Sequence, residues 1–284
     1  MARVDSADDV QFVSAAKSFQ SVGFVEFPKE VELGAVSAVA IGKDDEIYIL
    51  QRGEVPLLAF DKEGKFLRSW GQGLFKVPHG LRVDSEGNIW TTDNGNHVLR
   101  QFTREGKLVG TIGQEGKGVA GETGFKSPDD VVFDTQGNFY IADAGNGRIV
   151  KLSAEGKFLA AWGKKGKGEG EFATAHGLAI DAKDRIYVAD RGNKRVQIFD
   201  ATGKYIDSWT FGGNPFGLIV VGDELIASEG DQHVMYHLDT TGKTVAKWGD
   251  PKMLLLPHLM AQDSRGRLYV SEVNGKRVQI FERK

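Results

Sequence analysis

The chain has 284 residues, of which 40% are hydrophobic and 26% charged, with a formal net charge of −3. These values are ordinary for a globular protein and allow a large buried core. The slightly acidic balance argues against nucleic acid or an anionic membrane as a partner, and no apolar run approaches the roughly 20 residues of a transmembrane helix. The absence of cysteine excludes disulfides, thiolate metal ligands and cysteine nucleophiles.

The first residues, Met1 to Val10, are polar and lack the apolar core of a signal peptide. We therefore expect a cytoplasmic protein if the sequence is complete, and a periplasmic or secreted one if a signal peptide has been removed. The whole chain, 1–284, is predicted to be one domain and a monomer, with residues 1–18 as an extended arm.

Short alternating apolar runs, abundant glycine (37 residues) and scarce proline (7) predict many short strands rather than helices. One phrase recurs along the chain: a small apolar strand, a turn, a second strand ending in an acid, a Gly- and Asn-containing turn, and a third strand. In chain order its copies begin at Val36, Pro78, Pro128, Ala175, Phe216 and Pro257, the first and fifth being divergent.

The end of the second strand gives the period of the repeat. Six residues align there, 39 to 50 positions apart: Gln51, Asp93, Asp143, Asp190, Glu229 and Glu272. This spacing suits a four-stranded propeller blade. The acids recur in every clear copy, so we expect most of them to be structural, hydrogen-bonding the turn that follows.

A fourth strand begins with Gly-Lys after each of the first five copies, at Gly64, Gly106, Gly156, Gly203 and Gly242. The sixth copy ends with the chain at Lys284 and needs an outer strand from elsewhere. The alternating segment Phe19 to Phe27 fits, and would close the ring and remove the open edge. The sequence therefore predicts an all-β, six-bladed β-propeller closed by an N-terminal strand on the last blade.

The Gly-rich stretch from Gly113 to Gly124 is predicted to be a loop between blades. A phosphate-binding loop would need a helix after it, whose N-terminus holds the anion. A strand is expected instead.

The start of the innermost strand lines the central channel, and one residue per blade lies there: Ser37, His79, Asp129, His176, Phe216 and His258. Histidine occupies alternate blades, so three imidazoles point at one place from three directions. That arrangement, open on one side, is typical of a catalytic zinc site. The alternative is three unrelated histidines bound to water or backbone. The remaining histidines, His97, His233 and His237, are expected to be surface or turn residues.

A second set of candidates lies in the turns on the same face. Arg52 and Arg191 directly follow the second strand and could bind a substrate carboxylate or an oxyanion. Their alternative role is a solvated salt bridge to an acid of a neighbouring blade. Asp129 takes the place of a histidine in the channel, where it could orient a ligand or act as a base.

The segments "VPHGLRVD" (His79), "ATAHGLAID" (His176) and "LLPHLMAQD" (His258) resemble those of the NHL-repeat family. They are similar in particular to the segments that hold the catalytic zinc of the peptidyl-α-hydroxyglycine α-amidating lyases (peptidylamidoglycolate lyases). The resemblance implies zinc, or another divalent metal, on these histidines, and active-site arginines at Arg52 and Arg191.

Two positions depart from that family. Ala144 and Gly145 stand in the turn where the family has a catalytic tyrosine, and Leu259 stands where it has an aspartate that helps a structural calcium site. The first departure leaves proton transfer to Asp129 or to a metal-bound hydroxide.

The resulting expectation is a metal-dependent enzyme of the amidating-lyase type that acts on a small polar or anionic substrate. A metal-dependent hydrolase of esters, lactones or phosphoesters is the alternative that the missing tyrosine favours. A non-catalytic binding module is the third possibility. Its RNA-binding form would need a basic face with aromatic residues; the loop lysines Lys164, Lys165 and Lys167 cluster, but the net charge is negative and no aromatic stripe accompanies them.

Overall fold

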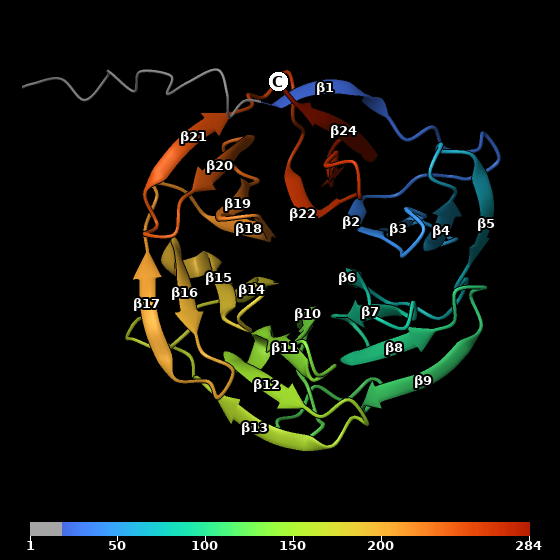
Figure 1. Cartoon of the computed structure of the whole chain (residues 1–284). Coiled ribbons are helices and arrows are strands. Elements are labelled where there is room, and N and C mark those ends of the chain that lie inside the picture. The colour runs from blue at the N-terminus through green and yellow to red at the C-terminus, as the bar shows by residue number, and fades with distance from the viewer. Residues whose placement is uncertain (1–18) are drawn as a thin grey trace, which may run out of the picture.

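The computed structural model describes residues 19–284, which form a ring of six four-stranded antiparallel sheets around a central axis (Figure 1). This confirms the six-bladed propeller. The arm expected at residues 1–18 lies outside the described residues.

Within each blade the strands follow one another from the axis to the rim. Blade one consists of β2 (Val36–Ile41), β3 (Ile47–Gln51), β4 (Leu57–Phe60) and β5 (Phe66–Trp70). Blade two consists of β6 (Pro78–Val83), β7 (Ile89–Asp93), β8 (Val98–Phe102) and β9 (Leu108–Gly113). Blade three consists of β10 (Pro128–Phe133), β11 (Phe139–Asp143), β12 (Arg148–Leu152) and β13 (Phe158–Trp162).

Blade four consists of β14 (Ala175–Ile180), β15 (Ile186–Asp190), β16 (Arg195–Phe199) and β17 (Tyr205–Trp209). Blade five consists of β18 (Pro215–Val221), β19 (Glu224–Glu229), β20 (Val234–Leu238) and β21 (Thr244–Trp248). Blade six consists of β22 (Pro257–Gln262), β23 (Leu268–Glu272), β24 (Arg277–Arg283) and the N-terminal β1 (Phe19–Phe24). Two 3₁₀ turns, Ala144–Asn146 and Arg191–Asn193, follow the second strands of blades three and four.

The N-terminal strand closes the ring as predicted. β1 pairs antiparallel with β24, from Phe19 opposite Arg283 to Phe24 opposite Gln279. The buried Phe19 ring also packs on blade five, 5.5 Å from the ring of Trp248. The first strand therefore joins blade six to its neighbour as well as completing its sheet.

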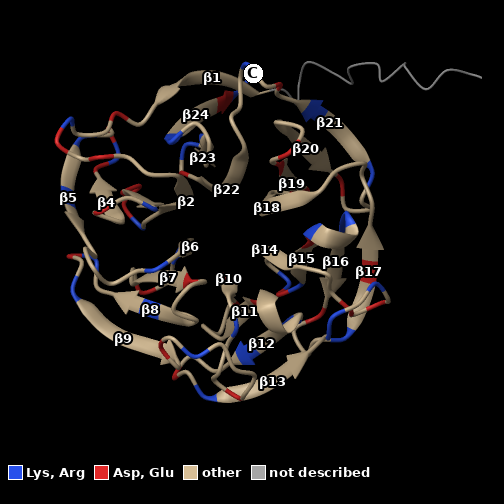
Figure 2. Ribbon diagram, turned by 180° about the vertical axis from the view of Figure 1, so that it is seen from behind, with Lys and Arg blue, Asp and Glu red and all other residues tan. Residues whose placement is uncertain are grey.

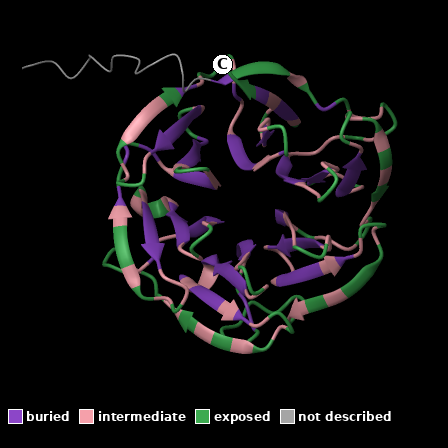
Figure 3. Ribbon diagram, in the orientation of Figure 1, coloured by how far each residue is buried: buried purple, intermediate pink, exposed green. Residues whose placement is uncertain are grey.

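The core lies between blades rather than at the axis. The three inner strands of each blade are largely buried, whereas the outer strands alternate between intermediate and exposed residues (Figure 3). The apolar clusters lie between neighbouring blades; one, for example, includes Ala142 and Ile149 of blade three with Leu178 and Val188 of blade four. Both signs of charge are interspersed around the ring (Figure 2).

The acids at the ends of the second strands are structural, as predicted. The buried Asp93 carboxylate accepts backbone N–H bonds from Lys76 and Val77, which enter the blade, and from Gly95 in the following turn. The acid thus ties the loop from the previous blade to its own blade. The stretch 113–124 contains no helix, as predicted; Gly113 ends β9, and the following residues run in the connection to β10.

The three histidines outside the channel divide into two groups. His97 and His233 lie in turns with φ of 63° and 62°, as predicted. The expectation for His237 is wrong: it lies on β20, and its side chain is fully buried. Its Nε2 accepts a bond from Trp248 Nε1 (2.9 Å) and its Nδ1 faces Glu224 (3.1 Å), so a hydrogen-bonded imidazole fills this core position.

Within the part of the chain that the structure describes, no helix is both long and apolar enough to cross a bilayer.

Candidate metal centre

Three histidines meet at the axis of the propeller. His79, His176 and His258 are the second residues of β6, β14 and β22, and all three are buried. Their ring centroids lie 4.8, 4.9 and 5.0 Å apart, and one ligand nitrogen of each lies within 4.8 Å of the others. The structure therefore brings together the three histidines that the sequence placed at equivalent positions of the repeat.

A β-bulge at the start of each inner strand gives the histidines their direction. The register shifts between Pro78 and Leu81 in blade two, and in the same place in every other blade. A bulge leaves a residue unpaired in the ladder and re-aims its side chain. Here each second residue is turned toward the axis.

Backbone carbonyls of the next blade set the tautomer of each imidazole. The three bonds run from Nδ1 of His79 to the carbonyl oxygen of Asp129 (2.8 Å), from His176 to Phe216 (2.8 Å) and from His258 to Ser37 (2.6 Å). A carbonyl only accepts, so each Nδ1 carries the proton and each Nε2 has a free lone pair. This is how metal-binding histidines are oriented in proteins.

The glycine after the first two histidines makes room for those carbonyls. A Cβ on Gly80 would lie 2.7 Å from the Asp129 carbonyl oxygen, and one on Gly177 would overlap the Phe216 carbonyl oxygen. The His-Gly pair was therefore a signal in the sequence that the imidazole is held by a neighbouring backbone.

Burial keeps the imidazoles neutral. It lowers the pKa of His258 to about 4, and burial together with the adjacent histidines lowers the pKa of His79 and His176 well below the ordinary value. Neutral imidazole is the form that binds a metal. Three oriented, deprotonated nitrogens fit a divalent ion with nitrogen preference, such as zinc.

Asp129 lies beside this centre. Its Oδ1 accepts a bond from Asn94 Nδ2 (2.8 Å), and its Oδ2 lies 4.0 Å from His176 Nε2. Burial raises the pKa of the Asp129 carboxyl to about 7, against the lowering effects of the Asn94 amide and the Arg191 charge. Asn94, which the sequence reasoning did not select, orients this carboxylate toward the histidines.

Arg52 and Arg191 lie at the mouth, and neither forms an ion pair with a carboxylate among the described residues. Arg52 is held through Nε, which donates to Ser37 Oγ (3.0 Å). Arg191 lies over the ring of Phe216, with Cζ 4.7 Å from the centroid. The salt-bridge alternative therefore does not describe these two residues.

Phe216 links the mouth to the centre. Its ring lies 5.5 Å from that of His176, and its carbonyl holds the Nδ1 of the same histidine. A guanidinium above an aromatic face is attracted by the ring quadrupole. Phe216 thus positions both Arg191 and His176, a role that the sequence reasoning missed.

At the position where the amidating lyases have a tyrosine, this chain offers backbone groups but no phenol. Ala144 and Gly145 lie in the first 3₁₀ turn, where the Ala144 carbonyl accepts a bond from Lys165 Nζ (2.6 Å). Lys165 also binds the carbonyl of Ala173 (3.1 Å). One of the loop lysines is therefore part of this mouth.

The structural calcium site of the amidating lyases does not fit this chain at Leu259. Leu259 is fully buried and packs in the apolar cluster between blades one and two, with Leu50 and Leu81. It offers no oxygen from its side chain.

The fold defines the class of protein: this chain is a six-bladed β-propeller, and three of its segments, residues 75–102, 125–152 and 172–199, match the NHL repeat. Its similarity to the amidating lyases is distant. A probable peptidyl-α-hydroxyglycine α-amidating lyase of Caenorhabditis elegans is 28% identical over 113 residues, covering 31% of this chain and 32% of that protein. NHL repeat-containing protein 3 of Mus musculus is 34% identical over 103 residues, covering 32% of this chain and 29% of that protein. The chain thus matches about a third of the length of these relatives.

Solved structures with the same architecture have little sequence in common with this chain. The structure of a streptogramin B lyase superposes with a TM-score of 0.73 at 11% identity, covering 95% of this chain and all (100%) of that one. A gluconolactonase of Xanthomonas campestris superposes with a TM-score of 0.71 at 14% identity, covering 95% and 93% of the two chains. At such identities the likeness concerns the fold alone.

Proposed function

We propose that this protein is a metal-dependent enzyme of the amidating-lyase type, acting on a small anionic substrate at the mouth of the channel. The observation that carries the proposal is the trio of buried imidazoles, each with Nδ1 bonded to a carbonyl and Nε2 free. A zinc ion bound there would act as a Lewis acid toward a substrate oxygen.

The residues around the centre have complementary roles in this proposal. Arg191 and Arg52 bind the substrate carboxylate, since a guanidinium matches a carboxylate in a two-pronged bond. Asp129 Oδ2 faces the centre and takes the proton of the substrate hydroxyl. In an α-hydroxyglycine the C–N bond then breaks, the nitrogen receives this proton from Asp129, and an amide and glyoxylate are released.

A hydrolase of lactones or esters is the second candidate, and the backbone at Ala144 favours it. A chain without a phenol at this position lacks one proton-transfer group of the lyases. Hydrolysis needs only a water molecule, a base such as Asp129 and a group that stabilises the oxyanion, for which Arg52 or Arg191 is suited.

One pair of assays separates the two candidates. We expect protein loaded with zinc to release glyoxylate from an N-acyl-α-hydroxyglycine, and to lose this activity when zinc is removed by a chelator. Acid release from a panel of lactones and esters without glyoxylate formation would instead establish the hydrolase. Zinc-loaded protein that turns over neither class contradicts both candidates and leaves a binding module.

A further inference from the structure

Arg82 lies across the channel, farther along the inner strands than the three histidines. Arg82 of β6 donates from Nε and Nη2 to the two carboxylate oxygens of Asp130 in blade three (3.1 and 2.6 Å). Its Nη2 also donates to the Leu178 carbonyl in blade four (3.0 Å), and its Nη1 to the Met260 carbonyl in blade six (3.5 Å). Because blades two, four and six alternate around the ring, a group that contacts all three lies near the axis.

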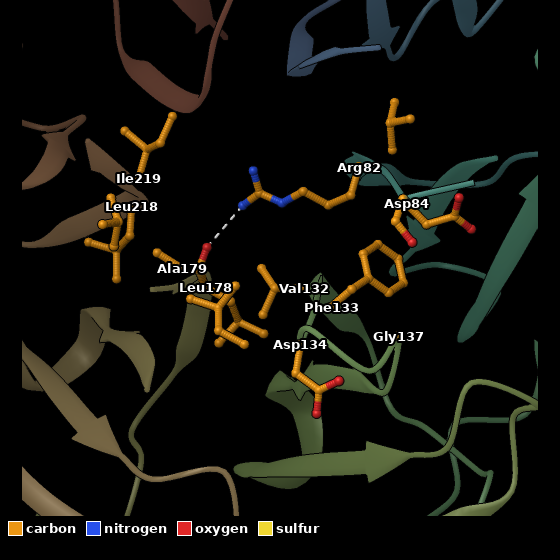
Figure 4. Close-up of a pocket in the computed structure, with 14 residues that line it drawn as sticks. Arg82, Asp84, Val132, Phe133, Asp134, Gly137, Leu178, Ala179, Leu218 and Ile219 are labelled. Atoms are coloured by element: carbon orange, nitrogen blue, oxygen red, sulfur yellow. Dashed lines mark hydrogen bonds between the residues drawn. The ribbon is translucent and has the colours of Figure 1, made fainter. Parts of the chain in front are cut away.

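Figure 4 shows the Arg82 side chain extended across the channel toward Leu178. It lines a pocket of about 340 Å³ formed by the later residues of the inner strands, such as Phe133 and Ile219. The histidines lie at the beginning of the same strands. The guanidinium is therefore situated between the histidine centre and the opposite end of the channel.

The partner carboxylate is fully satisfied. Asp130 is completely buried, and besides Arg82 it accepts the backbone N–H groups of Val131 and Leu178 (2.9 Å each). A buried ion pair offsets its desolvation only when the geometry is good and the remaining lone pairs are bonded. Here both conditions are met, so the pair is a rigid unit.

The unit is connected to each histidine-bearing strand close to its ligand. Arg82 comes three residues after His79, and its carbonyl acceptors Leu178 and Met260 each come two residues after the other two histidines. Asp130 directly follows Asp129, whose carbonyl holds His79. Arg82 thus lies on one of the three strands that supply the candidate metal ligands, and its guanidinium bonds to the other two.

We propose that Arg82, with Asp130, is a positioning residue for the histidine centre, which holds the three inner strands at the separation that a single metal ion requires. Tetrahedral zinc with Zn–N bonds of about 2.0–2.1 Å needs nitrogens roughly 3.4 Å apart. The ligand nitrogens lie within 4.8 Å of one another, so the strands must not move farther apart if one ion is to keep all three ligands. The inference rests on the metal site of the proposed function but not on the reaction.

The chain offers a matched control for this role. Arg100 on β8 is also buried and paired with a buried acid, Asp93, at 3.0 Å, but it lies on the third strand of blade two. Its guanidinium bonds to Asp93 and to Glu115, and neither of these lies on an inner strand. Arg82→Met and Arg100→Met both break a buried pair and should both lower the melting temperature. Only Arg82→Met should alter the metal site.

The test measures zinc affinity by competition with a chelator and the absorption spectrum of the cobalt-substituted protein. We expect Arg82→Met to weaken zinc binding by about 10–100-fold, the range for residues that orient metal ligands, and to change the cobalt spectrum. Arg82→Lys keeps the charge but not the planar fork, and should give a smaller loss. If Arg82→Met does not fold, Asp130→Asn is measured by the same criterion.

Zinc affinity and a cobalt spectrum equal to those of Arg100→Met would overturn the role of Arg82 and leave the proposed function intact. A parent protein that binds zinc but has no activity on any substrate would overturn the proposed function and leave Arg82 as a positioning residue. A parent protein that binds no zinc overturns both.

Discussion

At the scale of single residues, each imidazole of the centre is oriented by a blade other than its own. His176 comes from blade four, and the carbonyl that holds it belongs to Phe216 of blade five. The ligand geometry is therefore a property of the ring, because no blade by itself contains both the donor and the acceptor.

Replacing His176 by Ala should abolish stoichiometric zinc binding and activity together, since two nitrogens remain of three. The fold should persist with a loss of about 1–3 kcal/mol, the cost of leaving the Phe216 carbonyl without its donor. Elemental analysis and thermal unfolding check both parts. Full zinc occupancy in this variant would show that the histidine is not a ligand; His79→Ala and His258→Ala should behave alike.

The arginines are tested by substitutions that keep the charge. Arg52→Lys and Arg191→Lys should each reduce kcat/KM by an amount equivalent to about 1–3 kcal/mol, because Lys cannot form the two-pronged bond. Zinc content should not change. The control is Arg104→Lys, whose guanidinium pairs with Asp44 and Glu46 in turns at the other end of the strands. Parent-like kinetics in both Lys variants would make Arg52 and Arg191 ordinary turn residues.

The close approach at Gly177 provides a test of the carbonyl bond to His176. Gly177→Ala should cost about 1–3 kcal/mol of stability, since its Cβ would overlap the Phe216 carbonyl, and should weaken zinc binding by displacing the acceptor. Gly121→Ala is the control, because its Cβ would lie 3.6 Å from the nearest atom in the loop. Equal zinc affinities in the two variants, measured by chelator competition, would mean that the bond does not position the imidazole.

At the scale of elements, the ring depends on one strand from the other end of the chain. β1 covers the edge of β24, and Phe19 is buried against blade five. Unpaired edge strands expose backbone donors and acceptors and promote aggregation. By covering β24, β1 therefore removes the unpaired edge of blade six and holds this blade to its neighbour.

Deletion of residues up to Phe27 should lower the melting temperature strongly and promote aggregation. It removes the whole of β1 together with Val25 and Phe27, which pack in the cluster between blades six and one. Deletion of Met1 to Val10 is the control and should have little effect. Thermal unfolding and light scattering check this, and a truncated protein that melts like the full chain would contradict the role of β1.

At the scale of the whole molecule, one ion that binds only the folded ring should stabilise all six blades, because its three ligands come from alternate blades. Binding at a ligand concentration of 100 times Kd adds about 2.7 kcal/mol to the free energy of unfolding. The ring and the centre are thus expected to be linked thermodynamically.

Zinc titration of metal-free protein should raise the melting temperature and saturate at one ion per chain. Calcium at the same concentration should have no effect, because Leu259 supplies no carboxylate. Calorimetry with both ions checks this. A calcium-dependent shift equal to that of zinc would contradict the expectation that this chain lacks the calcium site.

Much of the architecture was determined by the sequence itself. The sequence predicted the period of the repeat, the closing strand and the strand ends at Asp93, Asp143 and Asp190. It also predicted that the three histidines occupy equivalent positions in alternate blades. The reason is that every blade repeats one local register, so equal positions in the repeat occupy equal places around the axis. A pattern within a blade is enough to place a residue at the channel.

Only the tertiary structure decided how these residues are held. The Asn94 bond to Asp129, the stacking of Arg191 on Phe216, the bond from Lys165 to Ala144 and the pairing of Arg82 with Asp130 all join segments that the repeat does not relate. The burial of His237, which the sequence reasoning placed at the surface, is of the same kind, because the partner Trp248 lies on the next strand and Phe19 of the closing strand packs beside it. Such contacts depend on the twist of each sheet and on the angle between neighbouring blades, and the periodic pattern of a single strand encodes neither.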